Sequence, residues 1–401
     1  MSPALAALAI ALLLGLQPVT TDLYLPALPS LASALGAPMA AAQLTMSLVL
    51  LAFGIGQLLM GPLSDRYGRR PVLLGGLALH ALASVGATGA PGIEALIAFR
   101  ALQGLGLAAS VVCARAMVRD LYEPHEGAHV MTWALSGLGV LALASPLLGG
   151  WLTAHVGWRA PLGAVATIAL ATLVFVAWRV PETTRQRDPQ ALRAGPLVHA
   201  LTGVLRHPAF RAWASLVSAT YGGLFLLLAG SSFVYIGVLG LSPWHYGLAM
   251  ASASLSYLAA TFYCRRLLVN HGLAGAVRRG ALFTLAGGLG MGALAWAGSR
   301  DVALVLLAHW LYNFGHGIHQ PCGQAGAVGA FPRTAGVASA LAGFMLALVA
   351  FAVGLWLGQA LDGTLQPLGF GLAFFAVLTS AVAWTWVQRD GEHFEPVASA
   401  S

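Results

Sequence analysis

The sequence predicts an all-α membrane protein with twelve transmembrane helices. Of its 401 residues, 58% are hydrophobic and only 8% are charged, whereas soluble domains carry about 25% charged residues. Apolar segments recur along the whole chain, each close to the roughly 20 residues that cross the hydrocarbon core of a bilayer. The charged residues lie mostly between these segments or at their ends. Such a chain could not cover a water-facing surface and is expected to be embedded in a membrane.

The expected spans follow one another with short polar connections. Their ranges are 4–34, 43–63, 71–90, 94–117, 128–153, 160–179, 209–238, 244–264, 277–297, 302–324, 336–361 and 367–388. An even number of spans places both termini on one side of the membrane. Most of the arginines border loops on that side, whereas Arg159 and Arg300 fall on the other. Because basic loops remain in the cytoplasm, we expect both termini to be cytoplasmic.

The longest polar segment divides the chain into two halves. It lies between Pro181 and Pro208, so we expect an N-terminal six-helix bundle at 1–179, a cytoplasmic linker at 180–208 and a C-terminal six-helix bundle at 209–401. Each half has its most basic short loop between its second and third spans. Matching positions in two halves predict the internal repeat of secondary transporters, although coincidence between positive-inside loops would give the same match.

Asp22 is the one carboxylate that lies well inside an apolar segment. A charge at the bilayer centre costs about 2.5–3.5 kcal/mol on insertion scales, so this position predicts a proton or cation site. Pro18, Pro26 and Pro29 are expected to interrupt the first helix and to leave backbone groups that line a cavity. The alternative is a structural acid that is permanently paired with an arginine.

Arg100 and Arg115 lie within the fourth span. By helical periodicity they share one stripe with Gly104, Leu107 and Val111. An arginine cannot itself deprotonate, but it can influence a nearby acid. A structural arginine is the alternative for Arg100, and it is the favoured interpretation for Arg115.

The loop at 61–71 closely resembles the signature loop of the major facilitator superfamily. Together with the expected ion-pair partner of its arginines, the gate residues are Gly61, Asp65, Arg66, Gly68, Arg69, Arg70 and Asp120. The two glycines would permit a tight turn, and Asp65 would cap a helix or pair with an arginine. The resemblance implies a cytoplasmic gate that latches the outward-facing state, and twelve helices in two pseudo-symmetric bundles.

Three further segments resemble motifs of drug:proton antiporters. The segment 22–29 resembles that of the bicyclomycin and chloramphenicol resistance branch, which implies that Asp22 is the proton-coupling acid. The segment 100–106 resembles the fourth-span motif, which implies that Arg100 takes part in proton transfer. The segment 136–150 resembles the fifth-span antiporter motif. There we expect Pro146 to bend the helix, and Gly149 and Gly150 to allow close helix contact.

Aromatic and polar residues inside the spans are candidates for a central substrate cavity. They are Tyr24, Gln103, Tyr221, Phe225, Tyr257, Asn313 and His316. His309 and His319 share the tenth span with His316, but no carboxylate accompanies them, so hydrogen-bonded packing or ligand contact is favoured over a metal site. Some multidrug relatives carry a second acid where this chain has Leu14. We therefore expect neutral, zwitterionic or weakly anionic substrates.

The expected function is proton-coupled efflux of small amphiphilic antibiotics, of the phenicol or bicyclomycin type, by alternating access. We expect a monomer in the bacterial inner membrane, driven by the proton gradient, with no cofactor, metal, catalytic residue or nucleic-acid partner. A chain without lysine cannot carry a Walker-type Gly-Lys motif, which disfavours a nucleotide-driven enzyme. A proton-coupled exporter or symporter of a natural metabolite, such as a sugar or amino-acid derivative, remains the alternative.

Overall fold

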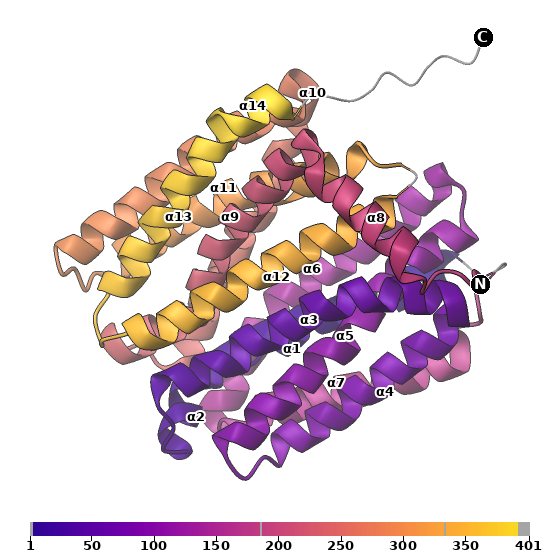
Figure 1. The fold of residues 1–401 in the computed structure, drawn as a ribbon. Coiled ribbons are helices and arrows are strands. Elements are labelled where there is room, and N and C mark those ends of the chain that lie inside the picture. The colour runs from indigo at the N-terminus through magenta and orange to yellow at the C-terminus, as the bar shows by residue number, and fades with distance from the viewer. Residues whose placement is uncertain (1–2, 185–186, 333, 392–401) are drawn as a thin grey trace.

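The regular elements of the protein are helices. The structure, a computed structural model, describes residues 3–184, 187–332 and 334–391. In chain order the elements are α1 (Pro3–Asp22), η1 (Leu25–Ala27), α2 (Leu28–Ala34), α3 (Met39–Tyr67), α4 (Arg69–Thr88), α5 (Ile93–Leu121), α6 (Pro124–His155), α7 (Arg159–Arg179), α8 (Ala194–Arg206), α9 (Pro208–Ser232), η2 (Phe233–Val238), α10 (Pro243–Trp296), α11 (Val302–Gly329), α12 (Ala335–Ala360), α13 (Gln366–Trp384) and α14 (Trp386–Asp390). Figure 1 shows them as a set of long helices with short connections.

The helices account for all twelve expected spans. Nine segments of the described chain are long and apolar enough to cross a membrane, and they match the first seven expected spans and the last two. The eighth and ninth expected spans are the two arms of α10, which breaks at Gly272, where φ is +64°. The tenth is α11, whose hydropathy is lowered by polar residues such as His309, Asn313 and His316. The predicted fold class is therefore confirmed.

The first span breaks immediately after Asp22. Pro26 lacks the N–H that would bond to the Asp22 carbonyl, so α1 ends there and the chain passes through η1 into α2. Pro18 lies inside α1, which continues through it, so the predicted interruption at Pro18 is wrong. Pro29 occupies the first turn of α2, where a missing N–H is tolerated. Asp22 thus stands at the end of a helix and not in its middle.

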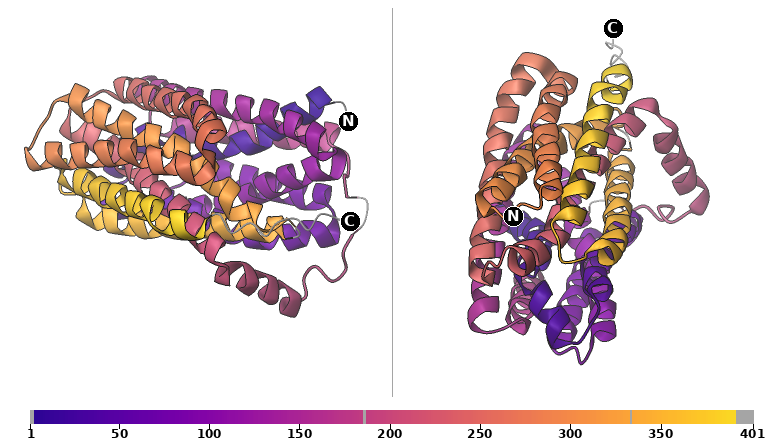
Figure 2. Two further views of the ribbon diagram at one scale, coloured as in Figure 1. Left: turned by 90° about the horizontal axis from the view of Figure 1, so that it is seen from above. Right: turned by 90° about the vertical axis from the view of Figure 1, so that its left-hand side faces the viewer.

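The helices form two bundles that meet along two helix pairs. Figures 1 and 2 show α1–α7 on one side and α9–α14 on the other, with α8 on the outside. Between the bundles, α3 packs along α12 and α6 packs along α10. Glycine makes the first contact close, because a Cβ built on Gly54 would lie 2.3 Å from the Cβ of Ala347. At this interface η1, which follows α1, contacts α9 and α10 of the C-terminal bundle.

Candidate proton and substrate site

Asp22 lies at the interface between the two bundles. Its side chain is half-buried, and Oδ1 accepts a hydrogen bond of 2.7 Å from the Thr21 hydroxyl. It interacts electrostatically with Tyr221 of α9 and Tyr246 of α10. Among the described residues, no ion pair includes Asp22. This arrangement disfavours the alternative of a structural acid permanently paired with an arginine.

Arg100 is fully buried on α5 and is held by neutral groups. Its Nε donates to the Thr45 carbonyl at 3.1 Å, and Nη1 donates to the Thr20 carbonyl at 3.0 Å and to Gln103 Oε1 at 3.0 Å. The guanidinium also lies 4.5 Å from the centre of the Tyr24 ring. In the described chain no carboxylate pairs with it. A buried cation without a counter-ion is costly and is retained where hydrogen bonds satisfy it.

A glycine permits this placement of Arg100. A Cβ at Gly104, one helical turn further along α5, would lie 2.1 Å from the Val49 carbonyl of α3. With glycine there, α5 approaches α3 closely enough for Arg100 to reach the Thr45 carbonyl. The small residue in the segment 100–106 therefore has a direct structural role.

Polar side chains of α4 extend the contacts of Arg100, and the sequence analysis did not identify them. His80 and Ser84 are both fully buried. Gln103 Nε2 donates to Ser84 Oγ at 2.8 Å, and His80 Nδ1 lies 3.0 Å from the Gln103 carbonyl. His80 Nε2 lies 3.3 Å from Thr20 Oγ1. We call Arg100, Thr20, Thr45, Gln103, Ser84, His80 and Tyr24 the Arg100 network.

Most of the predicted cavity residues are buried in this conformation. Tyr24, Gln103 and Phe225 are fully buried, the first two within the Arg100 network and the third in the hydrophobic core, so here they are packing contacts and do not line open space. Tyr221 and Tyr257 are half-buried. Their role as substrate contacts stays a prediction.

Two polar residues of α11 face the same region as Tyr257. His316 Nδ1 lies 3.1 Å from Thr220 Oγ1, and its ring centre lies 5.8 Å from that of Tyr257. Asn313 Nδ2 donates to the Ala253 carbonyl at 3.4 Å, whereas Asn313 Oδ1 is buried with no hydrogen-bond partner in the described chain. A buried acceptor that lacks a partner is unusual in proteins. No group of side chains suited to a metal ion was found among the described residues.

The antiporter-type segment of α6 packs against the broken end of α1 and against α10. A Cβ at Gly149 would lie 2.1 Å from the carbonyl oxygen of Leu23, the residue that follows Asp22. A Cβ at Gly150 would lie 2.6 Å from the Pro243 carbonyl, and one at Gly247 would lie 2.6 Å from the Pro146 carbonyl. Both α6 glycines therefore allow backbones to touch, as expected from the sequence.

At one end of the molecule an ion-pair cluster joins α3, α4 and α5. Arg69 Nε lies 3.0 Å from Asp120 Oδ2, which is the pairing expected from the sequence, and Arg69 also pairs with Asp65. Gly68 makes the turn between α3 and α4 with a φ of +102°. Gly61 lies inside α3 with open space around its Cβ position, so the predicted role of Gly61 in this turn is wrong. Arg66 is exposed beside the ring of Tyr67 at 5.4 Å.

Arg70 has a different partner from the one expected. Its Nε donates to the Val180 carbonyl at 2.9 Å and its Nη2 donates to the Ala177 carbonyl at 2.8 Å. These carbonyls belong to the C-terminal end of α7, where a cation is favourable because the last carbonyls of a helix lack partners. The expectation that Arg70 pairs with an acid on a neighbouring helix is therefore wrong.

Glu182, which the sequence analysis did not single out, caps the N-terminus of α4. Its Oε1 accepts from the backbone N–H groups of Arg69 at 2.9 Å and Thr184 at 3.0 Å, and Oε2 accepts from that of Arg70 at 3.2 Å. Burial opposes ionisation, but these hydrogen bonds outweigh it and lower the pKa of Glu182. Thr183 Oγ1 donates to Asp120 Oδ2 at 3.2 Å. We call Asp65, Arg69, Asp120, Glu182 and Thr183 the Arg69 cluster.

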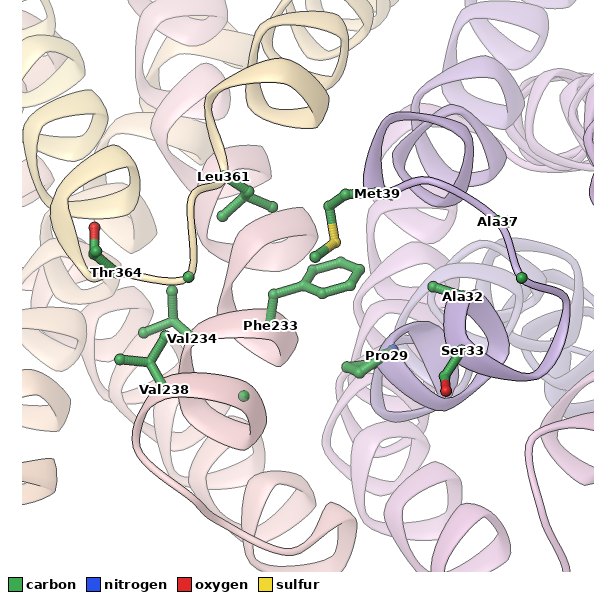
Figure 3. A pocket seen from close by; sticks show the side chains of 13 residues that line it. Pro29, Ala32, Ser33, Ala37, Met39, Phe233, Val234, Val238, Leu361 and Thr364 are labelled. Carbon is green, nitrogen blue, oxygen red and sulfur yellow. The ribbon is translucent and has the colours of Figure 1, made fainter.

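At the opposite end of the molecule, a hollow of about 470 Å³ lies between the two bundles. Figure 3 shows its apolar walls, which include Pro29 of α2, Phe233 and Val238 of η2, and Leu361 after α12. None of the predicted cavity residues lines it. The hollow and the predicted site around Asp22 are therefore separate features.

Comparisons with known proteins agree with this architecture. The family model described as the Major Facilitator Superfamily matches residues 10–355. The chain is 31% identical to multidrug resistance protein D of Escherichia coli K12, over 84% of each chain. It is 30% identical to a chloramphenicol resistance protein of Pseudomonas aeruginosa, over 80% of this chain and 75% of the relative. A structure of the inward-open xylose transporter XylE from E. coli has the same fold, with a TM-score of 0.74 over 96% of both chains at 16% identity.

The matched region includes Asp22, the loop 61–71, Arg100 and the fifth-span segment, which are the residues that carried the resemblance. The two relatives have names from drug resistance, in agreement with the expected bicyclomycin and chloramphenicol resistance branch. The chain belongs to the Major Facilitator Superfamily.

Proposed function

We propose that this protein is a proton-coupled antiporter that exports small amphiphilic antibiotics by alternating access. The observation that carries the proposal is the position of Asp22 at the broken end of α1, where it interacts electrostatically with Tyr221 and Tyr246 of the other bundle and belongs to no ion pair of the described residues. The names of the relatives, which refer to chloramphenicol and to multidrug resistance, support a drug as the exported molecule.

The proton would act by adding or removing the charge of Asp22. Protonated Asp22 needs no counter-ion, which suits a site where no cation of the described chain pairs with it. Loss of the proton leaves a partly buried anion two residues after Thr20, whose carbonyl already accepts from Nη1 of Arg100. A substrate that binds beside Asp22 then competes with the proton for one site. This competition couples export to proton entry without a covalent step.

The Arg69 cluster would be the cytoplasmic gate. It joins the ends of α3, α4 and α5 to the segment after α7, at the end of the molecule that carries most of the arginines. With this end in the cytoplasm, both termini are also cytoplasmic, in agreement with the positive-inside rule. We propose that the protein works as a monomer in a bacterial inner membrane, with the proton gradient as its source of energy and no cofactor.

Aromatic and polar side chains of α9, α10 and α11 favour a substrate with an apolar body and a hydrogen-bond donor. Tyr221 and Tyr257 offer aromatic surfaces that are half-buried. Asn313 Oδ1 is a buried acceptor without a partner in the described chain, so a hydroxyl or amide N–H of a ligand would satisfy it. Phenicol antibiotics have these features, which supports a neutral or weakly anionic amphiphile as the substrate.

The proposal is tested by drug accumulation in bacteria that lack their own phenicol exporters. Cells with wild-type protein should accumulate less chloramphenicol than cells with Asp22→Asn at equal membrane abundance. A protonophore should abolish the difference. Equal accumulation in both strains, for chloramphenicol and for bicyclomycin, would instead favour a transporter of a natural metabolite.

A further inference from the structure

His80 links two helices that carry the proposed coupling residues. It lies on α4 with no exposed surface, and its ring reaches α5 through the Gln103 carbonyl at 3.0 Å from Nδ1. On the other side its Nε2 reaches Thr20 Oγ1 of α1 at 3.3 Å. Thr20 precedes Asp22 by two residues, and its carbonyl accepts from Arg100. One imidazole therefore contacts both the end of α1 and the turn of α5 that holds Arg100.

The available protons determine how these groups bond. The Gln103 carbonyl can only accept, so His80 Nδ1 carries a hydrogen. The Thr20 hydroxyl has one proton and two acceptors in reach, the Leu16 carbonyl at 2.6 Å and His80 Nε2. With a neutral ring, Nε2 is an acceptor, and the hydroxyl must turn from Leu16 to satisfy it. Thr20 then forms one bond through its hydroxyl to α4 and another through its carbonyl to α5.

Burial and the nearby cation of Arg100 favour the neutral ring of His80. Besides α5, α4 packs against α7 and α3, whose charged residues lie at their ends. On the two helices that bond to His80, the charged residues nearest to the bonded residues Thr20 and Gln103 are Asp22 of α1 and Arg100 of α5. Gln103 bonds to His80 through its carbonyl and to Arg100 through its side chain. A buried imidazole so close to a cation is held without a second proton.

The hydroxyl of the neighbouring Thr21 also has two acceptors in reach. Thr21 Oγ1 lies 3.1 Å from the Gln17 carbonyl and 2.7 Å from Asp22 Oδ1, and its single proton can serve only one of them. Two adjacent threonines thus each divide one proton between the α1 backbone and a side chain of the proposed coupling site.

We propose that His80 is a positioning residue for proton coupling. As a neutral imidazole that accepts from Thr20 and donates to Gln103, it holds the end of α1 at a set position relative to Arg100. Asp22 follows Thr20 by two residues, so the position at which it gains and loses its proton depends on the same contacts. This inference rests on the proposed coupling role of Asp22, and its test must distinguish failure of either idea.

The test compares the pH midpoint of Asp22 protonation in purified, lipid-reconstituted variants. His80→Asn keeps a donor near the Nδ1 position and loses the acceptor for Thr20, and Thr20→Val removes the hydroxyl while keeping its shape. Each should shift the midpoint by about half a pH unit or more, a threefold change in the protonation equilibrium. The double variant should shift it no further than either single variant, because both remove the same hydrogen bond.

Thr20→Ser, which keeps the hydroxyl, should retain the wild-type midpoint. Thr167→Val is the matched control, since Thr167 Oγ1 makes only a local bond of 2.9 Å to the Gly163 carbonyl on an exposed face of α7. The midpoint is read in two ways, from substrate-driven proton movement and from the infrared carboxyl band that disappears in Asp22→Asn. The second needs no transport, so it tests His80 even if no drug is exported. Wild-type midpoints in folded His80→Asn and Thr20→Val would overturn the proposal.

Discussion

Arg100 donates from Nη1 to the main-chain carbonyl of Thr20 at 3.0 Å, two residues before Asp22 on the same helix. The cation of α5 is therefore anchored to the segment that carries the Asp22 carboxylate, although these two charges form no ion pair with each other. This arrangement lets the charge of Asp22 change without unpairing a buried arginine, because Arg100 is already satisfied by three neutral acceptors.

A lysine should not be able to replace the guanidinium group of Arg100. Arg100→Lys keeps the charge but cannot reach the carbonyls of Thr45 and Thr20 and the amide of Gln103 together. We expect a loss of about 1–3 kcal/mol for each buried acceptor left without a donor, and a strong fall in export. Thermal unfolding in detergent measures the first effect, with the exposed Arg300→Lys as control. Equal stability of the two variants would show that the three hydrogen bonds contribute little.

The contact between α6 and the end of α1 should tolerate no side chain. In Gly149→Ala the new Cβ would lie 2.1 Å from the Leu23 carbonyl, so a backbone must move. Overpacking of this kind costs about 1–3 kcal/mol, and here it would also displace the neighbour of Asp22. The matched control is Gly139→Ala on the same helix, which meets nothing within 4 Å. Transport and thermal stability should fall in Gly149→Ala alone, and similar behaviour of both variants would argue against this contact.

The ion pair between Arg69 and Asp120 should be stronger than an exposed pair. Their side chains are only 11% and 21% exposed, and Thr183 also donates to Asp120. A double-mutant cycle with Arg69→Gln and Asp120→Asn should give a coupling free energy of about 1 kcal/mol or more. The same cycle on Arg389, which is 70% exposed, and Asp390 serves as control. A coupling free energy no larger than that of the control pair would contradict a role of the Arg69–Asp120 pair in the gate.

Glu182 should make the protein more sensitive to acid. Because hydrogen bonds lower the pKa of folded Glu182, its contribution to stability is fully present above the unfolded pKa, about 4.3, and is lost as the pH falls through the folded pKa. Between neutral pH and about pH 3, the thermal unfolding temperature should therefore fall less steeply for Glu182→Gln than for wild type. Glu94→Gln, which removes an exposed carboxylate at the start of α5, is the control. Parallel curves for wild type and Glu182→Gln would contradict this role.

The spans could be predicted because hydropathy adds over some 20 residues, and the small-residue contact at Gly149 could be predicted because its motif is local. Hydrogen-bond partners that come from distant parts of the chain could not be predicted from the sequence. The Glu182 carboxylate reaches α4 across a sequence separation of more than a hundred residues. It caps the N-terminus of α4, a role that the sequence analysis gave as one of two alternatives for Asp65.

The hydrogen-bond partners of His80 and Arg70 also could not be predicted from the sequence, for two different reasons. A single histidine in an apolar helix has no local signal for its partners, so its link between Thr20 and Gln103 emerges only from the packing of three helices. Arg70 belongs to a basic motif that suggested an acidic partner, yet the nearby end of α7 offers unpaired carbonyls that suit a cation as well.

The most direct test of the central claim is proton movement in liposomes that contain a pH-sensitive dye and purified protein under an imposed proton gradient. Chloramphenicol, florfenicol and unrelated drugs would be added to wild type and to Asp22→Asn, each shown to be folded. We expect drug-triggered proton movement in wild type and none in Asp22→Asn. Equal proton movement in both would contradict the assignment of Asp22 as the proton-coupling residue.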